Sequence, residues 1–100
     1  MVKHVILWKL KEELTAEEKE NVKAGIKEGL ERLAGKVPGL VDVKVNINGL
    51  PTSTVDVMLD TTFTDADALK AYSTNPLHVA VADGKVRPYT AVRSCLDYEV

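Results

Sequence analysis

The sequence predicts an α+β, ferredoxin-like domain with the element order β-α-β-β-α-β. Three observations lead to this prediction. Runs of alternating apolar and polar residues predict four strands, and a longer run with helical spacing separates the first strand from the second. A second helical stretch, interrupted once by Asn75-Pro76, separates the third strand from the fourth. In this arrangement the strands form a four-stranded antiparallel sheet with the helices on one face.

The first strand and the long helix after it are predicted over residues 2–10 and 15–36. One face of the strand consists of Val2, His4, Ile6, Trp8 and Leu10. The helix begins with a capping box, in which Thr15 caps the first turn and Glu18 reaches back to it. Its apolar stripe is Val22, Ile26, Leu30, Leu33 and Val37. Gly35 and the Pro-Gly pair that follows are expected to end the helix.

The second and third strands are predicted over residues 40–48 and 53–63, joined by a turn at Asn48-Gly49-Leu50-Pro51. The core face of the second strand is Val41, Val43, Val45 and Ile47. That of the third is Val55, Val57, Leu59, Thr61 and Phe63. The opposite face of both strands is polar apart from Met58, and no helix remains to cover it. We therefore expect a second copy of the chain to pack on this face in a homodimer.

The second helical stretch is predicted to begin at Thr64, to break at Asn75-Pro76, and to continue as a new helix to about residue 86. Pro88 is expected to close it and to lead into a last strand over residues 90–99. One face of that strand is Ala91, Arg93, Cys95, Asp97 and Glu99.

Composition excludes several classes of partner. The net charge is −2 and the Lys residues are interleaved with Glu, which argues against nucleic-acid binding. Cys95 is the only cysteine, so we expect no intrachain disulfide and a cytoplasmic, reducing location. No signal-like segment or apolar run long enough to span a membrane is present. Phosphate-binding loops and metal-ligand spacings are missing too, so we predict no cofactor and no metal.

The helix break brings a tyrosine and a histidine together. Asn75 is a favoured N-cap and Pro76 suits the first helical position. His78 then lies in the first turn, where the helix dipole favours the neutral imidazole. A neutral imidazole beside the Tyr72 phenol suits general acid–base chemistry near neutral pH. The alternative is structural: His78 bonds a strand carbonyl, and Tyr72 is a core-edge tyrosine with a hydrogen-bonded hydroxyl.

Other polar residues of the two outer strands leave alternatives open. His4 is either a satisfied core histidine bonded to Asp97 or Arg93, or a group that lines a pocket. Arg93 and Asp97 form a buried ion pair, or Arg93 recognises a carboxylate or enolate. We expect Cys95 to be a packing residue rather than a nucleophile.

Short motifs along the whole chain together resemble the stress-responsive dimeric α/β barrel (Dabb) domain family. They are Lys3-His4 in the first strand, Pro38-Gly39 before the second, Ala71-Tyr72 with Asn75-Pro76-Leu77-His78, and Arg93 with Asp97-Tyr98-Glu99. The resemblance implies one domain over residues 1–100, whose sheet pairs with that of a second copy to form a dimeric α/β barrel. It also implies a cavity between sheet and helices.

Within this family the chain resembles olivetolic acid cyclase, a cofactor-free polyketide cyclase. That resemblance implies catalytic roles for Tyr72, His78 and Asp97. It implies a pocket lined by His4, Trp8, Val57, Val81 and Arg93. The cyclase has a second pocket histidine at the position of Val57, so we do not expect the same substrate.

Two functions remain open. The first is a cofactor-independent lyase, cyclase or isomerase acting on a small carbonyl compound with a carboxylate or phenolic group. His78 would remove a proton next to the carbonyl, Tyr72 would stabilise the enolate, and Asp97 would orient His78. The alternative is a non-catalytic stress-response or ligand-binding dimer, in which His78 and Tyr72 are fully hydrogen-bonded and point away from any void.

Overall fold

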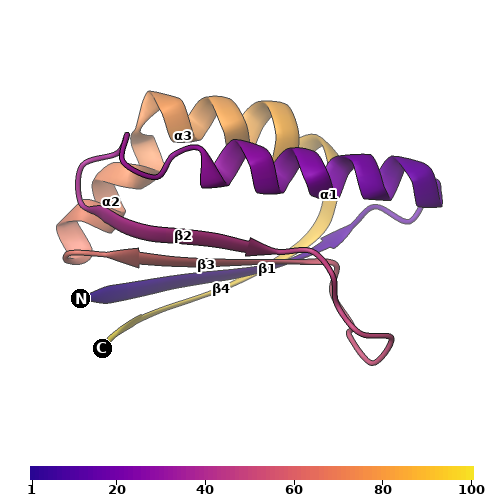
Figure 1. Ribbon diagram of the computed structural model, residues 1–100, viewed down its shortest axis with the longest axis horizontal. Helices are drawn as coiled ribbons and strands as arrows, with labels where there is room; N and C mark the ends of the chain where they lie inside the picture. Colours follow the sequence, from indigo (N-terminus) through magenta and orange to yellow (C-terminus); the bar gives the residue numbers. More distant parts are fainter.

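The computed structural model describes residues 1–100 and contains an antiparallel sheet with helices on one face (Figure 1). The strands are β1 (Val2–Leu10), β2 (Leu40–Asn46), β3 (Val57–Phe63) and β4 (Thr90–Glu99), in the order β2-β3-β1-β4. The helices are α1 (Ala16–Glu31), α2 (Ala66–Thr74) and α3 (Pro76–Val81). A π-helical turn, η1 (Ala82–Val86), and a 3-10 turn, η2 (Arg87–Tyr89), lead from α3 to β4. The predicted ferredoxin-like fold is confirmed. None of the helices combines the length and apolar composition that a membrane span requires.

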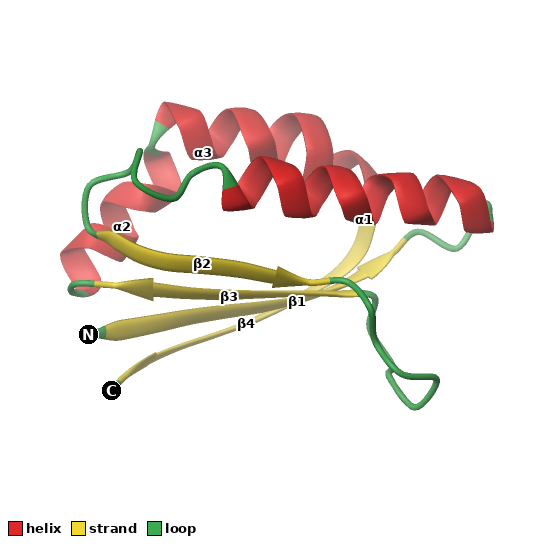
Figure 2. Cartoon of the chain, viewed as in Figure 1, coloured by secondary structure: helices red, strands yellow, loops and turns green.

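The core lies between the helix layer and the sheet layer (Figure 2). Strand alternation directs the expected side chains of β1 and β3 toward the helices, and Val57, Leu59 and Phe63 are almost completely buried there. The side chains of Ile26 and Leu30 on α1 pack against them. Burial of an aliphatic side chain of this size stabilises the fold by about 1.5–3 kcal/mol.

Two side chains of α1 attach this helix to the outer edge of β2. Lys27 Nζ donates to the carbonyl oxygen of Val45 at 2.7 Å, and the backbone N–H of Val45 donates to Glu31 Oε2 at 2.9 Å. Lys27 and Glu31 also form an ion pair at 2.9 Å. The exposed backbone N–H and carbonyl of Val45 on this edge strand are thereby satisfied within the chain.

The capping box of Thr15 and Glu18 is formed as predicted, with both reciprocal hydrogen bonds present. The predicted end of this helix at residue 36 is wrong. α1 ends at Glu31, and the chain then runs through turns in which Gly35 has a φ of 76°. That left-handed conformation favours glycine and stops a helix.

The second and third strands are shorter than predicted, and one side chain lies on the other face. The pairing of β2 with β3 shifts between Leu40 and Asp42, so Val41 is half exposed rather than buried. Before β3, Asp56 still bonds to β1, because its carboxylate accepts from the Leu10 N–H at 2.8 Å. The cap of α2 is Asp65 rather than Thr64.

The edge strand β4 has no helix above it. Every residue from Ala91 onward is exposed, although the antiparallel pairing with β1 runs from Val2 to Leu10. This open edge beside α2 and α3 determines where the chain has space for a ligand.

Candidate functional site

A single residue separates α2 from α3 and fixes the angle between them. The backbone N–H of Asn75 donates to the carbonyl of Tyr72 at 3.1 Å, and Asn75 Oδ1 accepts from the Leu77 N–H at 2.9 Å. Asn75 is therefore the C-cap of one helix and the N-cap of the next, with Pro76 at the first position of α3, as predicted. The break brings the rings of Tyr72 and His78 into contact, with centroids 4.0 Å apart and planes tilted by 32°.

A cavity of about 180 Å³ lies between β1, the start of β4 and the helical segment from α2 to η2. Its lining includes the predicted site residues His4, Trp8, Tyr72, His78 and Arg93. It also includes residues that the sequence analysis did not identify, namely Ile6, Leu69, Ser73, Ala82, Val86, Arg87 and Thr90. Ala82 and Val86 follow His78 at steps of four residues, so helical periodicity was a signal that could have identified them.

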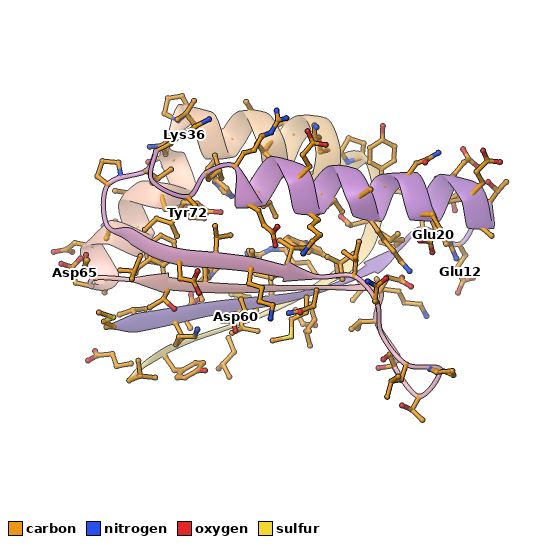
Figure 3. The ribbon with its side chains drawn as sticks, in the orientation of Figure 1. Glu12, Glu20, Lys36, Asp60, Asp65 and Tyr72 are labelled. Atoms are coloured by element: carbon orange, nitrogen blue, oxygen red, sulfur yellow. The ribbon has the colours of Figure 1, made fainter.

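Tyr72 lies between the helices and the sheet (Figure 3) and is 2% exposed. Its ring meets that of Phe63 edge to face at 5.0 Å. Its hydroxyl is buried and has no hydrogen-bond partner in the chain. Burial raises the pKa of Tyr72 to about 12, so the phenol stays protonated at neutral pH and is available as a donor.

The imidazole of His78 is half-buried, and its Nδ1 is buried without a hydrogen-bond partner. Burial is the main cause that lowers the pKa of His78, and the charges of Arg87 and His4 lower it further. The nearby backbone carbonyls of Ser73 and Tyr72 oppose this shift, although neither meets hydrogen-bond geometry with Nδ1. The ring is therefore neutral at pH 7. The helix dipole predicts a neutral imidazole from the sequence, whereas in the structure burial is the main cause of the neutral state.

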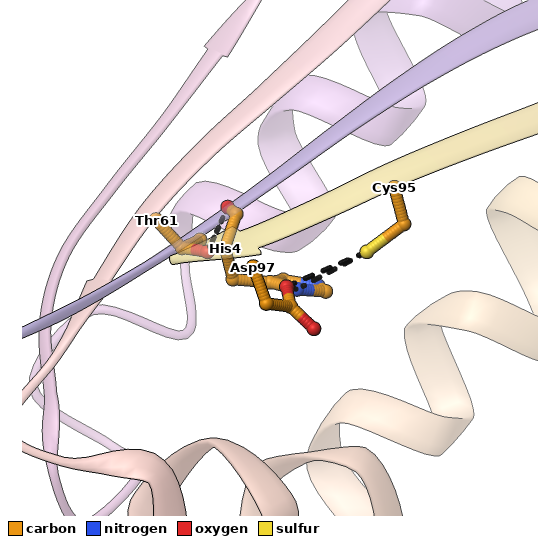
Figure 4. A network of polar contacts seen from close by, with 4 residues as sticks. All are labelled: His4, Thr61, Cys95 and Asp97. Carbon is orange, nitrogen blue, oxygen red and sulfur yellow. Dashed lines mark hydrogen bonds and ion pairs between the residues drawn. The ribbon is translucent and has the colours of Figure 1, made fainter. Parts of the chain in front are cut away.

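The expected hydrogen bond between Asp97 and His78 is not formed. Asp97 Oδ1 lies 2.5 Å from Nδ1 of His4, its cross-strand neighbour on β1 (Figure 4). This contact also replaces the expected ion pair between Asp97 and Arg93. Burial alone would raise the pKa of Asp97, but the hydrogen bond and charge of His4, with smaller effects of Cys95 and Arg93, lower it overall. His4 is thus the satisfied histidine of the two.

Two of the expected pocket residues lie elsewhere. Val57 is 1% exposed and belongs to the apolar core. It lies on β3, which is separated from β4 by β1. Val81 packs against α1, so closely that a Cβ on Gly29 would lie 2.9 Å from its Cγ1. Both were placed in the pocket by resemblance, and the packing of α1 explains why neither reaches it.

Cys95 was expected to pack in a strand interior but is exposed on β4. Its thiol lies 3.4 Å from Asp97 Oδ1 and 3.7 Å from His4 Nδ1. Burial raises the pKa of this thiol, with a further contribution from Asp97. A protonated thiol is a poor nucleophile, which agrees with the expectation that Cys95 is not one.

The fold and cavity define a ferredoxin-like α+β subunit with its candidate site between sheet and helices. The chain belongs to the stress-responsive A/B barrel domain (Dabb) family, whose model matches residues 2–100.

Solved structures agree with this assignment. A dimeric protein of unknown function and ferredoxin-like fold from Bacteroides fragilis is 34% identical, with a TM-score of 0.93, over 99% of this chain and 95% of that chain. A Dabb family protein from Mesorhizobium loti is 19% identical, with a TM-score of 0.75, over 99% and 95%. A hydroxynitrile lyase from Passiflora edulis is 17% identical, with a TM-score of 0.72, over 97% and 90%. The last two likenesses concern the fold. No curated protein matches this chain.

Proposed function

We propose that the cavity binds a small carbonyl compound and that His78 removes a proton next to its carbonyl group. The observation that supports this proposal is the pair of unpartnered polar atoms, the Tyr72 hydroxyl and Nδ1 of His78, on residues that line one cavity. A buried polar group without a partner costs about 1–3 kcal/mol. A ligand that supplies both partners recovers that cost on binding.

The protonation states suit this chemistry. The neutral imidazole of His78 accepts the proton, and the electron pair of the broken C–H bond moves toward the carbonyl oxygen. The protonated hydroxyl of Tyr72 donates to that oxygen as negative charge develops on it. Arg93 also lines the cavity and favours a substrate that carries a carboxylate or phenolate. Arg87 lines it as well, but its guanidinium forms an ion pair with Asp83. Such a reaction is a lyase, cyclase or isomerase step and requires no cofactor.

The size of the cavity limits the substrate. A volume of about 180 Å³ is close to the cavity of about 150 Å³ that accommodates benzene in a dry protein core. We therefore infer a ligand of one ring or less, such as a small keto acid or phenolic acid. The resemblance to olivetolic acid cyclase supports proton abstraction, while the different lining argues for another substrate. The hydroxynitrile lyase among the structural neighbours is compatible with lyase chemistry on this fold.

We further propose that the chain forms a homodimer through the open face of its sheet. Leu96, Val92 and Tyr98 are 64%, 53% and 43% exposed on β4, facing away from the helices. The loop over residues 47–56 projects on that same side (Figure 1). Structural neighbours are described as dimers. Light scattering after size exclusion should give a dimer in micromolar solution, and a monomer would contradict it. A cytoplasmic location would keep Cys95 reduced.

Exchange of the substrate proton tests the role of His78 directly. The protein is incubated in D₂O with a panel of keto acids and phenolic acids, and loss of the proton next to the carbonyl is followed by NMR. We expect exchange with the wild-type protein and none with His78→Gln, while the ligand still binds. If the substrate proton exchanges at the wild-type rate in His78→Gln, a residue other than His78 must be the base.

A matched pair of variants tests Tyr72. Tyr72→Phe is expected to weaken ligand binding by about tenfold, which corresponds to one lost hydrogen bond. Tyr89→Phe removes a hydroxyl from a residue outside this cavity and should leave binding unchanged. If every ligand tried binds without proton exchange, the result would instead support the second candidate, a non-catalytic ligand-binding dimer. The two arginines in the cavity lining also fit this candidate, because they can bind an anionic ligand without catalysis.

A further inference from the structure

Three side chains with different metal-binding atoms meet on the open edge of the sheet (Figure 4). His4 on β1 pairs with Asp97 on β4, and Cys95 lies one position further along the same face, opposite Ile6. The ligand atoms of His4, Cys95 and Asp97 all lie within 4.8 Å of one another. Nothing in the proposed proton transfer requires a thiol at this place.

The distances between these atoms are close to those of a tetrahedral zinc site. With Zn–N and Zn–O bonds near 2.1 Å and Zn–S near 2.3 Å, tetrahedral angles separate sulfur from nitrogen or oxygen by about 3.6 Å, and nitrogen from oxygen by about 3.4 Å. Cys95 Sγ lies 3.7 Å from His4 Nδ1 and 3.4 Å from Asp97 Oδ1. Both distances are within about 0.2 Å of the tetrahedral value, whereas His4 Nδ1 and Asp97 Oδ1 lie much closer together, at 2.5 Å.

That third separation is a hydrogen bond, and metal binding would replace it. Nδ1 of His4 would lose the shared proton, and the imidazole would carry its proton on Nε2. The Cys95 thiol would release its proton to solvent. The carboxylate would move outward by just under 1 Å to reach the tetrahedral spacing. Asp97 has room for this movement, because its side chain is 46% exposed. The main chain at His4 is held in place by the Thr61 hydroxyl, which donates to the His4 carbonyl at 2.6 Å.

The geometry points to a transition-metal site formed by His4 Nδ1, Cys95 Sγ and Asp97 Oδ1, with Zn²⁺ as the preferred ion. A mixed set of nitrogen, sulfur and oxygen ligands selects zinc or cobalt over magnesium and calcium, which prefer oxygen alone. The thiolate and the carboxylate together balance the charge of a divalent ion. Lys70 and Arg93 border the same groove, so the fourth position suits water or a small anion.

This site is separate from the proposed base and donor. His78 and Tyr72 provide no ligand, so metal binding and proton exchange can each fail without the other. Of the three proposed ligands, only His4 also lines the cavity; Leu69, Ser73 and Arg93 border both the cavity and the groove beside Cys95.

Cobalt titration of the reduced full chain tests the site, because Co²⁺ occupies zinc sites and reports a bound thiolate by a charge-transfer band. We expect one Co²⁺ per chain, the charge-transfer band and tetrahedral visible bands, all displaced by Zn²⁺. Cys95→Ser should abolish the band. It should also weaken metal binding by more than about 10–100-fold, which is the loss seen when a residue that only hydrogen-bonds to a metal ligand is removed. Asp97→Asn should also weaken binding, while His78→Gln, the matched control with the other histidine, should bind as the wild type does.

The opposite results are equally distinct. Absence of a thiolate band in the wild-type protein would overturn the proposal, as would equal binding by Cys95→Ser or loss of binding in His78→Gln. Circular dichroism verifies that each variant is folded. If Cys95→Ser does not fold, the wild-type cobalt spectrum and Asp97→Asn decide the question.

Discussion

The two halves of the core differ in how closely their side chains are packed. Under α1, the sheet and helix enclose side chains such as Leu30, Val45 and Leu59 that are at most 1% exposed. Under α2 and α3, there is a cavity of about 180 Å³ whose lining includes residues with two unpaired polar atoms. One further buried polar atom, Oδ1 of Asp60, has no partner with hydrogen-bond geometry. It lies 2.6 Å from Lys3 Nζ, so it is paired through this ion pair.

The difference teaches where stability and chemistry reside in a small domain. In the α1 half, Lys27 and Glu31 satisfy even the exposed backbone groups of Val45 at the sheet edge. The other half leaves Tyr72 and His78 without partners, which costs stability and keeps two groups free to meet a ligand. The closely packed half under α1 thus contributes most of the stability, and the half under α2 and α3 retains the cavity.

Two leucines provide the strongest test of this comparison. Leu30→Ala in the packed half should lower the free energy of unfolding by about 2–5 kcal/mol, because it leaves a new void. Leu69→Ala at the cavity should cost less than half as much, since its side chain already borders empty space. Urea denaturation of both variants measures the difference. Equal losses would show that the two halves are packed alike.

A pair of glycines on α1 sharpens the comparison within one helix. A Cβ on Gly29 would lie 2.9 Å from Val81 and 3.2 Å from Lys85, so Gly29→Ala should destabilise by about 1–3 kcal/mol through overpacking. A Cβ on Gly25 meets nothing within 4 Å. Gly25→Ala should therefore stabilise the protein by about 0.5–1 kcal/mol, as alanine does in helices. Thermal denaturation distinguishes the two signs, and matching signs would refute the close contact.

Removal of the unpaired hydroxyl should stabilise the hollow half. Tyr72→Phe keeps the ring contact with Phe63 and deletes a buried donor without a partner. We expect the free energy of unfolding to rise by about 1 kcal/mol. The same variant should bind ligand more weakly, so stability and binding change in opposite directions. A lower unfolding free energy would mean that the hydroxyl is satisfied after all.

The two halves should also respond to acid in different pH ranges. The pKa of His78 is lowered from 6.5, so the unfolded chain takes up this proton first, and stability declines as pH falls below 6.5 through the folded pKa. The pKa of Glu31 is lowered from 4.5 despite burial, which opposes the shift, by the Val45 N–H and Lys27. Its contribution is present above 4.5 and is lost as pH falls through the folded pKa. Urea unfolding as a function of pH should show the upper decline vanish in His78→Gln and the lower one shrink in Glu31→Gln. Unchanged profiles would contradict these assignments.

Local signals predicted most of the fold. Thr15 with Glu18 and Asn75 with Pro76 act through hydrogen bonds within three residues, so their motifs are sufficient to locate the helix ends. Alternation of side chains likewise predicted the core face of β3. The errors arose where strand pairing determines the direction of a side chain. Val41 is an example, because its exposure follows from a shift in the register of β2 against β3.

The candidate site was predictable to a smaller extent. Tyr72 and His78 share one short motif, so the sequence indicated their pairing. The partner of Asp97 depends on the register of β1 against β4 and on residues 93 positions apart. For the same reason the spacing of His4 and Cys95 along the chain gave no sign of a common metal site.

The shared cap at Asn75 has a consequence for how such domains diversify. The relative placement of Tyr72 and His78 depends on backbone geometry around one asparagine and one proline. Ile6 and Trp8 enter the cavity from β1, and Arg93 enters it from β4. Substitutions on those strands can therefore reshape the ligand space while the reactive pair keeps its geometry. Directed evolution toward new substrates should accept mutations on β1 and β4 readily and reject them at Asn75-Pro76.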